Sequence, residues 1–159
     1  IATEGRHGRV KSSDGLLDLA LAIPKEMGGK GDATNPEQLF AAGYAACFEN
    51  AVIHLAKKQK IQIKDADVSV IADISLHAND QEGFDLAVSL TTIIHGLSQR
   101  DAEELVQAAH AVCPYSNAIK GNIDVVLNTQ GKPFSQTLGL NYKGQKARLI
   151  RIIKNIRIF

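Results

Sequence analysis

Polar and apolar residues follow two different periods along this chain, and the longest apolar stretch lies within residues 34–58. Residues 39–48 are apolar on almost every side, apart from a glycine and a tyrosine. A helix that is apolar all round is normally buried. The start of the stretch carries residues that begin helices, namely two possible caps, a first-turn proline and a glutamate at capping-box spacing (Thr34, Asn35, Pro36 and Glu37). The pattern predicts a buried central helix.

Segments with period-two alternation flank this helix and predict strands. Residues 9–12 and 17–23 lie on either side of a Ser-Asp-Gly turn signal and predict a hairpin. Residues 68–76 and 84–90, joined by a polar loop, predict a longer hairpin.

The second half of the chain predicts helix and then strand. Ser98 is placed to cap an amphipathic helix, which Pro114 interrupts before a further short helical turn. Residues 123–127 predict a last strand. The order ββ–α–ββ–α–β predicts an α+β domain, with antiparallel strands around the central helix.

The charge is divided unevenly between the two ends of the chain. Residues 1–130 carry 11 Lys and Arg against 17 Asp and Glu, a net charge of −6, which argues against a nucleic-acid surface. Residues 131–159 carry seven basic residues and no acidic one, and their structure is left open between an edge strand, an amphipathic helix and disorder. We therefore divide the chain into a domain over residues 1–130 and a basic tail over residues 131–159.

No signal peptide is visible, and the apolar run at 39–48 is too short to cross a bilayer. The chain begins at Ile1 without a methionine, which leaves room for a leading segment. Two cysteines do not make a disulfide scaffold. We expect a cytoplasmic, reducing location and no membrane partner.

Cys47, in the middle of the central helix, has three interpretations: a small buried hydrophobe, half of a structural disulfide, or a reactive thiolate. A structural disulfide is not expected in a reducing compartment. Burial raises the pKa of a thiol, so a reactive thiolate needs a cation beside it, and a buried cation needs a carboxylate. Arg6 and Arg9 are candidate cations, and Glu37 is a candidate carboxylate.

The position of Glu37 creates a geometric difficulty. On one unbroken helix, the ten residues between Glu37 and Cys47 give roughly 280° of rotation and about 15 Å of rise, so the side chains would not meet. Either Gly43 breaks the helix or a second subunit supplies one group. His54 lies seven residues beyond Cys47, about 10 Å along the axis, which is too far for a Cys–His pair. The histidines and cysteines show no metal-ligand spacing, so no zinc site is predicted.

Two segments around the cysteines carry a resemblance to a known family. NPEQLFAAGYAACF contains Cys47, and VCPYSNA contains Cys113, sixty-six positions further on. Together they resemble the organic hydroperoxide resistance (Ohr) branch of the OsmC/Ohr family. GRHGRVKSSDGLLDL and GNIDVVLN resemble the flanking segments of that family, so the resemblance covers residues 1–128.

The resemblance implies a thiol peroxidase that reduces organic and fatty-acid hydroperoxides to alcohols. It implies that Cys47 is the peroxidatic thiolate and Cys113 the resolving thiol. Arg6 would hold the thiolate, and Glu37 would orient Arg6 through a salt bridge. The fold would be an intertwined homodimer whose sheets wrap two central helices. No metal, haem or flavin is implied; dihydrolipoamide or a lipoylated protein would reduce the disulfide.

The aromatic residues around Cys47 would favour an apolar hydroperoxide over hydrogen peroxide, at roughly 0.8 kcal/mol per buried methylene (Phe40, Tyr44 and Phe48). The sequence departs from the family pattern at three places. Glu4 occupies a position where the family has glycine, the strand before Arg6 is expected to be mostly or wholly missing, and the tail has no counterpart.

Three rival interpretations remain at this stage. A redox sensor or binding module would keep both cysteines without turnover. An acyl hydrolase would need a general base near Cys47, for which His54 is badly spaced. The basic tail could also act as an anchor on a membrane surface.

Overall fold

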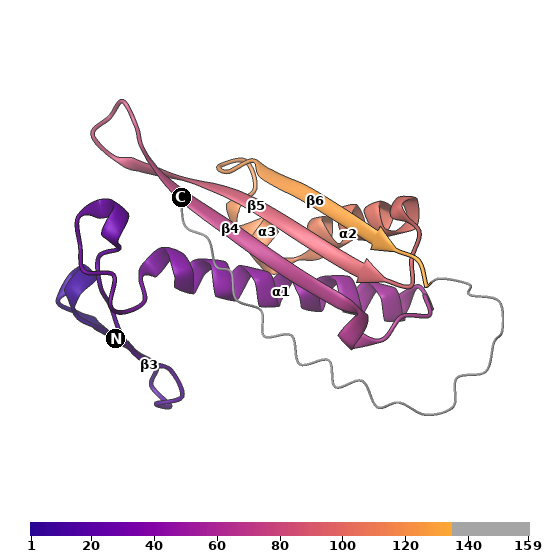
Figure 1. Cartoon of the computed structure of the whole chain (residues 1–159), viewed down its shortest axis with the longest axis horizontal. Helices are drawn as coiled ribbons and strands as arrows, with labels where there is room; N and C mark the ends of the chain where they lie inside the picture. The colour runs from indigo at the N-terminus through magenta and orange to yellow at the C-terminus, as the bar shows by residue number, and fades with distance from the viewer. Residues whose placement is uncertain (135–159) are drawn as a thin grey trace.

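The structure, a computed structural model of the 159-residue chain, describes residues 1–134. All but the first four residues of the predicted basic tail therefore lie outside the described residues. Two three-stranded sheets and three α-helices form the described part (Figure 1). The predicted α+β class is confirmed.

The central helix, α1, runs without a break over Pro36–Lys58. Asn35 is its N-cap: the side chain accepts a hydrogen bond of 2.8 Å from the backbone N–H of Gln38. Thr34 instead donates its hydroxyl to the Gln38 side chain, so the capping box predicted between Thr34 and Glu37 is not formed. Glu37 is therefore free for another role.

The larger sheet is built from β4 (Val68–Ala78), β5 (Phe84–His95) and β6 (Val125–Lys132). β4 and β5 form the long antiparallel hairpin predicted from the sequence. Alternate residues of β5 are fully or nearly fully buried, as a strand with one covered face requires (Val88, Leu90, Thr92 and Ile94).

β6 differs from the prediction because it runs parallel to β5, with Val88 opposite Val125. The expectation of antiparallel pairing throughout was therefore wrong at this strand. Between β5 and β6 the chain forms two helices, α2 (Gln99–Val112) and α3 (Pro114–Ile119), which make a crossover connection. A crossover carries the chain back to the end of the sheet at which β5 began, so β6 runs parallel to β5.

The helices cover one face of this sheet. α1 packs on β4 and on α2, and α2 packs on β6. Ser98 caps α2 as predicted, and the apolar face of α2 is buried against the sheet and α1. Between these layers lies the main hydrophobic core, with Tyr44, Phe48 and Leu90 among its fully buried side chains.

The smaller sheet joins β1 (Ala2–Thr3), β2 (Arg9–Lys11) and β3 (Asp18–Ala20) in antiparallel order. β2 and β3 form the predicted first hairpin. The strand before Arg6, which was expected to be mostly or wholly missing, is β1, with only two residues. Figure 1 shows this sheet beside the beginning of α1, away from β6.

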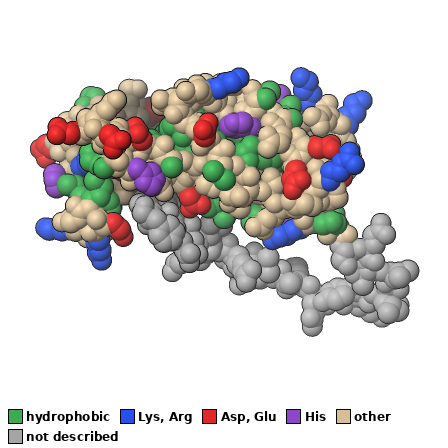
Figure 2. Space-filling view, turned by 90° about the horizontal axis from the view of Figure 1, so that it is seen from above, with side chains coloured by type: hydrophobic (Ala, Val, Ile, Leu, Met, Phe, Trp, Pro, Cys, Tyr) green, Lys and Arg blue, Asp and Glu red, His purple; other side chains and the backbone are tan. Residues whose placement is uncertain are grey.

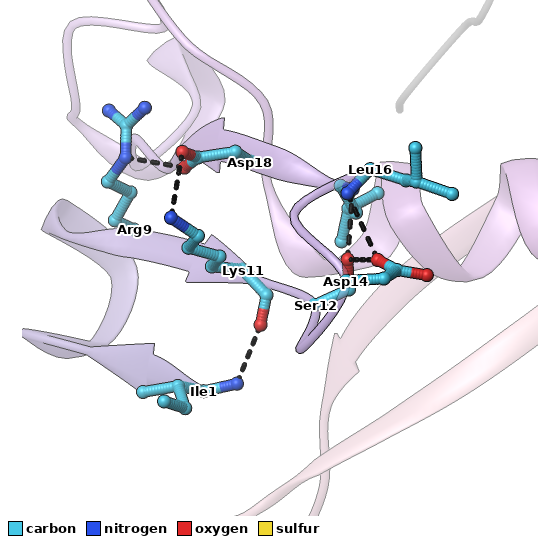
Figure 3. Close-up of polar contacts among 8 residues, drawn as sticks. Ile1, Arg9, Lys11, Ser12, Asp14, Leu16 and Asp18 are labelled. Carbon is cyan, nitrogen blue, oxygen red and sulfur yellow. Dashed lines mark hydrogen bonds and ion pairs between the residues drawn. The ribbon is translucent and has the colours of Figure 1, made fainter.

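Exposed polar contacts hold the smaller sheet together (Figure 3). The amino group of Ile1 donates to the Lys11 carbonyl oxygen over 2.7 Å, and Arg9 pairs with Asp18 over 2.6 Å. Because exposed ion pairs contribute about 0–1 kcal/mol, this sheet is far more weakly supported than the core. Figure 2 shows acidic and basic side chains interspersed on one face of the described residues.

One face of α1 is not covered by the described chain. It carries a stripe of exposed or half-buried residues at helical spacing (Leu39, Ala42, Ala46, Asn50 and Ile53). The expectation that the helix is buried all round is thus met on one side only. By length and composition alone the whole of α1 could span a membrane, although the apolar run at residues 39–48 by itself is too short to do so. Core helices pass the same test, and α1 lies against β4 and α2.

Candidate active site

The two cysteines, hereafter the thiol pair, lie next to each other. Cys47 is near the middle of α1, and Cys113 lies at the junction of α2 and α3. Cys113 donates a hydrogen bond to Cys47 over a distance of 3.7 Å between the sulfurs. Both are free, Cys47 partly exposed and Cys113 fully buried. A disulfide bond is about 2.0 Å long, so the sulfurs must move closer to form one.

Arg6 and Glu37, hereafter the charge pair, make a two-pronged salt bridge. Arg6 lies in a 3₁₀ turn, Gly5–His7, and its two terminal nitrogens donate to the two oxygens of Glu37 over 2.9 and 2.5 Å. The hydrogen bond from Arg6 lowers the pKa of Glu37, while burial opposes the shift. Such paired contacts fix the plane of a guanidinium as well as its charge. Arg9, the other candidate cation, pairs with Asp18 instead.

The charge pair does not reach the thiol pair within this chain. α1 is unbroken at Gly43, so Glu37 and Cys47 remain separated by about 15 Å along the axis. Burial raises the pKa of the Cys47 thiol, and Arg6 is not among the groups that act on it. Of the two explanations offered by the sequence, a break at Gly43 is wrong.

The group that does support a thiolate on Cys47 is a backbone amide that the sequence did not suggest. A hydrogen bond from the N–H of Tyr115 lowers the pKa of Cys47, in opposition to burial and to Cys113. Pro114 begins α3, and the N–H groups of a first helical turn have no partner within the helix. The proline after Cys113 was a usable signal, because it predicted a helix start at that point.

The aromatic residues predicted to contact substrate are of two kinds. Tyr44 and Phe48 are fully buried core residues, so neither presents surface to a ligand. The Tyr44 hydroxyl is 2.9 Å from the hydroxyl of Ser116. Phe40 is half-buried, and Tyr115, which was not predicted, is 38% exposed and stacks on Tyr44 with ring centroids 5.6 Å apart. Of the aromatic residues near the thiol pair, Phe40 and Tyr115 are therefore the ones with surface that a substrate could touch.

An apolar pocket of about 250 Å³ lies beside the charge pair. Glu37 is on its wall, and most of the remaining lining is apolar (Pro24, Met27, Ile74, Leu76 and Phe84). A pocket that joins a charged group to apolar walls suits an amphiphilic organic molecule. His54 is exposed and follows Cys47 by seven residues on α1, about 10 Å along the helix axis. Within residues 1–134, no group of three or more His, Cys, Asp or Glu could hold a metal ion.

Comparison with known proteins identifies the family. The sequence profile described as OsmC-like protein matches residues 29–128. The chain belongs to the OsmC-like family. An organic hydroperoxide resistance protein of Xanthomonas axonopodis pv. citri is 47% identical over 127 residues, covering 79% of this chain and 88% of the relative. The recognition of the OsmC/Ohr family from the cysteine segments is confirmed.

Solved structures of OsmC-like proteins agree with this placement. An organic hydroperoxide resistance protein from Legionella pneumophila shares 57% identity and a TM-score of 0.78, over 82% of this chain and 93% of that one. A Vibrio cholerae relative, solved with captopril in one of its active sites, shares 51% identity and a TM-score of 0.77, over 81% and 88%. The predicted OsmC/Ohr-like fold is confirmed, and membership implies a part in peroxide detoxification.

Proposed function

We propose that this chain is a thiol peroxidase that reduces organic hydroperoxides to alcohols, with Cys47 as the peroxidatic and Cys113 as the resolving cysteine. The observation that carries the proposal is the 3.7 Å distance between the two sulfurs. The two cysteines also differ in exposure as these roles require: Cys47 is partly exposed and can meet a substrate, whereas Cys113 is fully buried. The similarity to relatives named organic hydroperoxide resistance proteins supports the choice of organic hydroperoxides as substrates.

The chemistry balances with these two thiols and an external dithiol. The Cys47 thiolate attacks the terminal oxygen of the hydroperoxide, the O–O bond breaks, and the alkoxide takes a proton and leaves as the alcohol. Cys47 is then a sulfenic acid. Cys113, as a thiolate, attacks that sulfur, and hydroxide leaves with a proton as water. An external dithiol reduces the disulfide and is itself oxidised to a disulfide. Dihydrolipoamide or a lipoylated protein is the proposed reductant, with no metal, haem or flavin.

A homodimer would give the charge pair its role. α1 carries an uncovered stripe, and the charge pair lies about 15 Å from the thiol pair on the same helix. If two copies of α1 pack antiparallel through this stripe, Arg6 and Glu37 of one chain would lie beside Cys47 of the other. Arg6 would then stabilise the thiolate and polarise the peroxide, and Glu37 would hold Arg6 in place.

The same arrangement would favour organic substrates over hydrogen peroxide. The apolar pocket beside Glu37 would accept the organic part of the hydroperoxide while its O–O group faces Cys47. Each buried methylene would contribute about 0.8 kcal/mol to binding. The captopril found in an active site of the Vibrio cholerae relative supports the view that such a site admits a small organic molecule.

The test is to follow turnover and protein mass together. With excess dihydrolipoamide, the chain should reduce cumene hydroperoxide through many cycles and hydrogen peroxide more slowly. With one equivalent of cumene hydroperoxide and no dithiol, its mass should fall by about two hydrogens. Cys47→Ser should abolish both results. A single oxidation without turnover would support the redox-sensor interpretation, and full activity in Cys47→Ser would refute the proposed chemistry.

A further inference from the structure

Gly43 lies in the middle of α1, one helical turn before Cys47, and the Tyr115 ring lies against it. A Cβ built on Gly43 would be 2.9 Å from the Tyr115 hydroxyl oxygen, 3.4 Å from the ring carbon that bears it and 3.7 Å from the next ring carbon. Carbon atoms in good van der Waals contact lie about 3.5–4.0 Å apart. Only the hydroxyl oxygen would therefore clash seriously with a side chain at this position.

The backbone conformation does not require glycine here. α1 is regular through Gly43, which is not among the residues with positive φ. A glycine inside a helix costs roughly 0.5–1 kcal/mol relative to alanine. Gly43 neither breaks the helix nor adopts a left-handed conformation. What distinguishes it from alanine in this structure is the missing Cβ, which lets Tyr115 lie close to its Cα.

Tyr115 is held on α1 from three sides. Its ring packs against Gly43, stacks on Tyr44 at 5.6 Å and lies 6.1 Å from Phe40, all three being residues of α1. Tyr115 is also the second residue after Cys113, whose sulfur lies 3.7 Å from the sulfur of Cys47, and a hydrogen bond from the Tyr115 backbone N–H lowers the pKa of the Cys47 thiol. The position of the ring and the position of the amide are therefore linked through one residue.

We propose that Gly43 is a positioning residue for the peroxidatic thiol: the missing side chain allows Tyr115 to lie flat on α1, and this contact holds the Tyr115 amide at the sulfur of Cys47. The inference rests on the proposed function for its meaning in catalysis, but the contact concerns the thiol itself. In the thiolate, the amide is a hydrogen-bond donor to a charged acceptor, which is a stronger interaction than a bond between neutral groups. Displacement of Tyr115 by a methyl group would weaken this bond.

The experiment compares Gly43→Ala in two backgrounds, the natural chain and Tyr115→Phe. Tyr115→Phe removes the oxygen at 2.9 Å, keeps the backbone amide and leaves the nearest ring carbon at 3.4 Å. The readout is the rate at which iodoacetamide alkylates Cys47 between pH 5 and pH 10, with the modified peptide identified by mass spectrometry. This readout needs no peroxide, so it remains informative even if the chain has no peroxidase activity.

In the natural background, Gly43→Ala should raise the pKa of the Cys47 thiol by about one pH unit, roughly the strength of one hydrogen bond to a charged group. In the Tyr115→Phe background, the same substitution should change that pKa by less than a third as much. If Gly43→Ala folds only when combined with Tyr115→Phe, the clash with the hydroxyl is confirmed by that rescue.

Two results would overturn the inference. One is an equal rise in the thiol pKa, or an equal loss of folding, in both backgrounds, which would show that glycine is needed for a reason unrelated to Tyr115. The other is an unchanged alkylation profile for Gly43→Ala in the natural background. If the natural chain does not reduce cumene hydroperoxide, the proposed function is wrong. The comparison of the two backgrounds still decides the role of Gly43.

Discussion

The thiol pair and the charge pair are both formed within one chain, yet they are built in different ways. Cys47 and Cys113 meet inside the core, where α1, α2 and α3 pack together. Arg6 and Glu37 meet at the edge of the molecule, where a short turn of the weakly supported N-terminal sheet reaches the start of α1. The thiol pair thus has a rigid surround, and the charge pair depends on a single salt bridge.

The difference suggests a division of labour between the two regions. Bond making and breaking at sulfur requires sulfurs that approach within a bond length, which two side chains of one packed core can achieve. A positive charge acts over a longer distance and can be supplied by another copy of the chain. The variants that follow change the thiol pair, the charge pair or both, and the measurements are of turnover or of stability.

The largest effect is expected from Cys113→Ser, which leaves the charge pair and Cys47 in place. One equivalent of cumene hydroperoxide should still oxidise Cys47, detected as a sulfenic acid with a dimedone probe. Steady-state turnover with dihydrolipoamide should fall on the order of 100-fold, because no disulfide forms for the dithiol to attack. Normal turnover in this variant would show that Cys113 is not the resolving thiol.

The next effect comes from mixing two variants that are impaired in different regions and that should each be inactive alone. After unfolding and refolding together, Cys47→Ser and Arg6→Ala chains should recover about a quarter of natural activity, because half of the dimers are mixed and one of their two sites is intact. A mixture of Cys47→Ser and Cys113→Ser is the matched control. It should recover no turnover, since the thiol pair comes from one chain. Equal recovery, or none, in the two mixtures would contradict a site shared between chains.

The sequence predicted where each cysteine lies because the causes are local, whereas their pairing was an expectation from the family resemblance. The buried helix around Cys47 and the helix junction at Cys113 both follow from short patterns of apolar residues, a cap and a proline. The requirement that a buried thiolate has a cation, and that the cation has a carboxylate, also led to Arg6 and Arg9 as candidate cations and to Glu37 as the candidate carboxylate; the family resemblance then favoured Arg6.

Other features could not be derived from residue identities. The amide of Tyr115 is a backbone group that all residues except proline carry, and only the folded chain shows where it points. An apolar stripe on α1 indicates burial but does not indicate whether the same chain or a second copy covers it. The parallel pairing of β6 depends on where a crossover ends, and strand patterns alone do not reveal it.

A smaller effect is expected from the acid dependence of stability. Because the hydrogen bond from Arg6 lowers the pKa of Glu37 in the folded chain, the charge pair stabilises the fold above the ordinary glutamate value of 4.5, and this stabilisation is lost as pH falls through the lowered value. Since Arg6 is 35% exposed, the contribution is about 1 kcal/mol after allowance for solvent screening.

Urea unfolding of the natural chain and of Glu37→Gln at pH 7 and at pH 3 measures this contribution. The variant should be less stable by about 1 kcal/mol at pH 7, with the difference nearly gone at pH 3. Asp18→Asn, which removes an exposed pair of the same sheet, serves as the control and should change stability little at either pH. The same loss for Glu37→Gln at both pH values would mean that the side chain acts by packing and not by charge.

The smallest effect concerns how Arg6 is presented. Glu4, immediately before the turn that carries Arg6, has a left-handed backbone with φ of 56°. For a residue with a Cβ this conformation costs about 1 kcal/mol, which a glycine would not pay. The greater flexibility of glycine in the unfolded chain offsets part of the stability gained by the substitution. Glu4→Gly should therefore raise the free energy of unfolding by about 0.5 kcal/mol.

Glu4→Ala separates backbone strain from charge in this last test. It removes the same carboxylate but keeps the Cβ, so it should not stabilise the chain, and only Glu4→Gly should raise the melting temperature. If strain at Glu4 also loosens the charge pair, Glu4→Gly should further enlarge the pH 7 difference between Glu and Gln at position 37. Equal melting temperatures for the glycine and alanine variants would show that the left-handed turn carries no strain that weakens the presentation of Arg6.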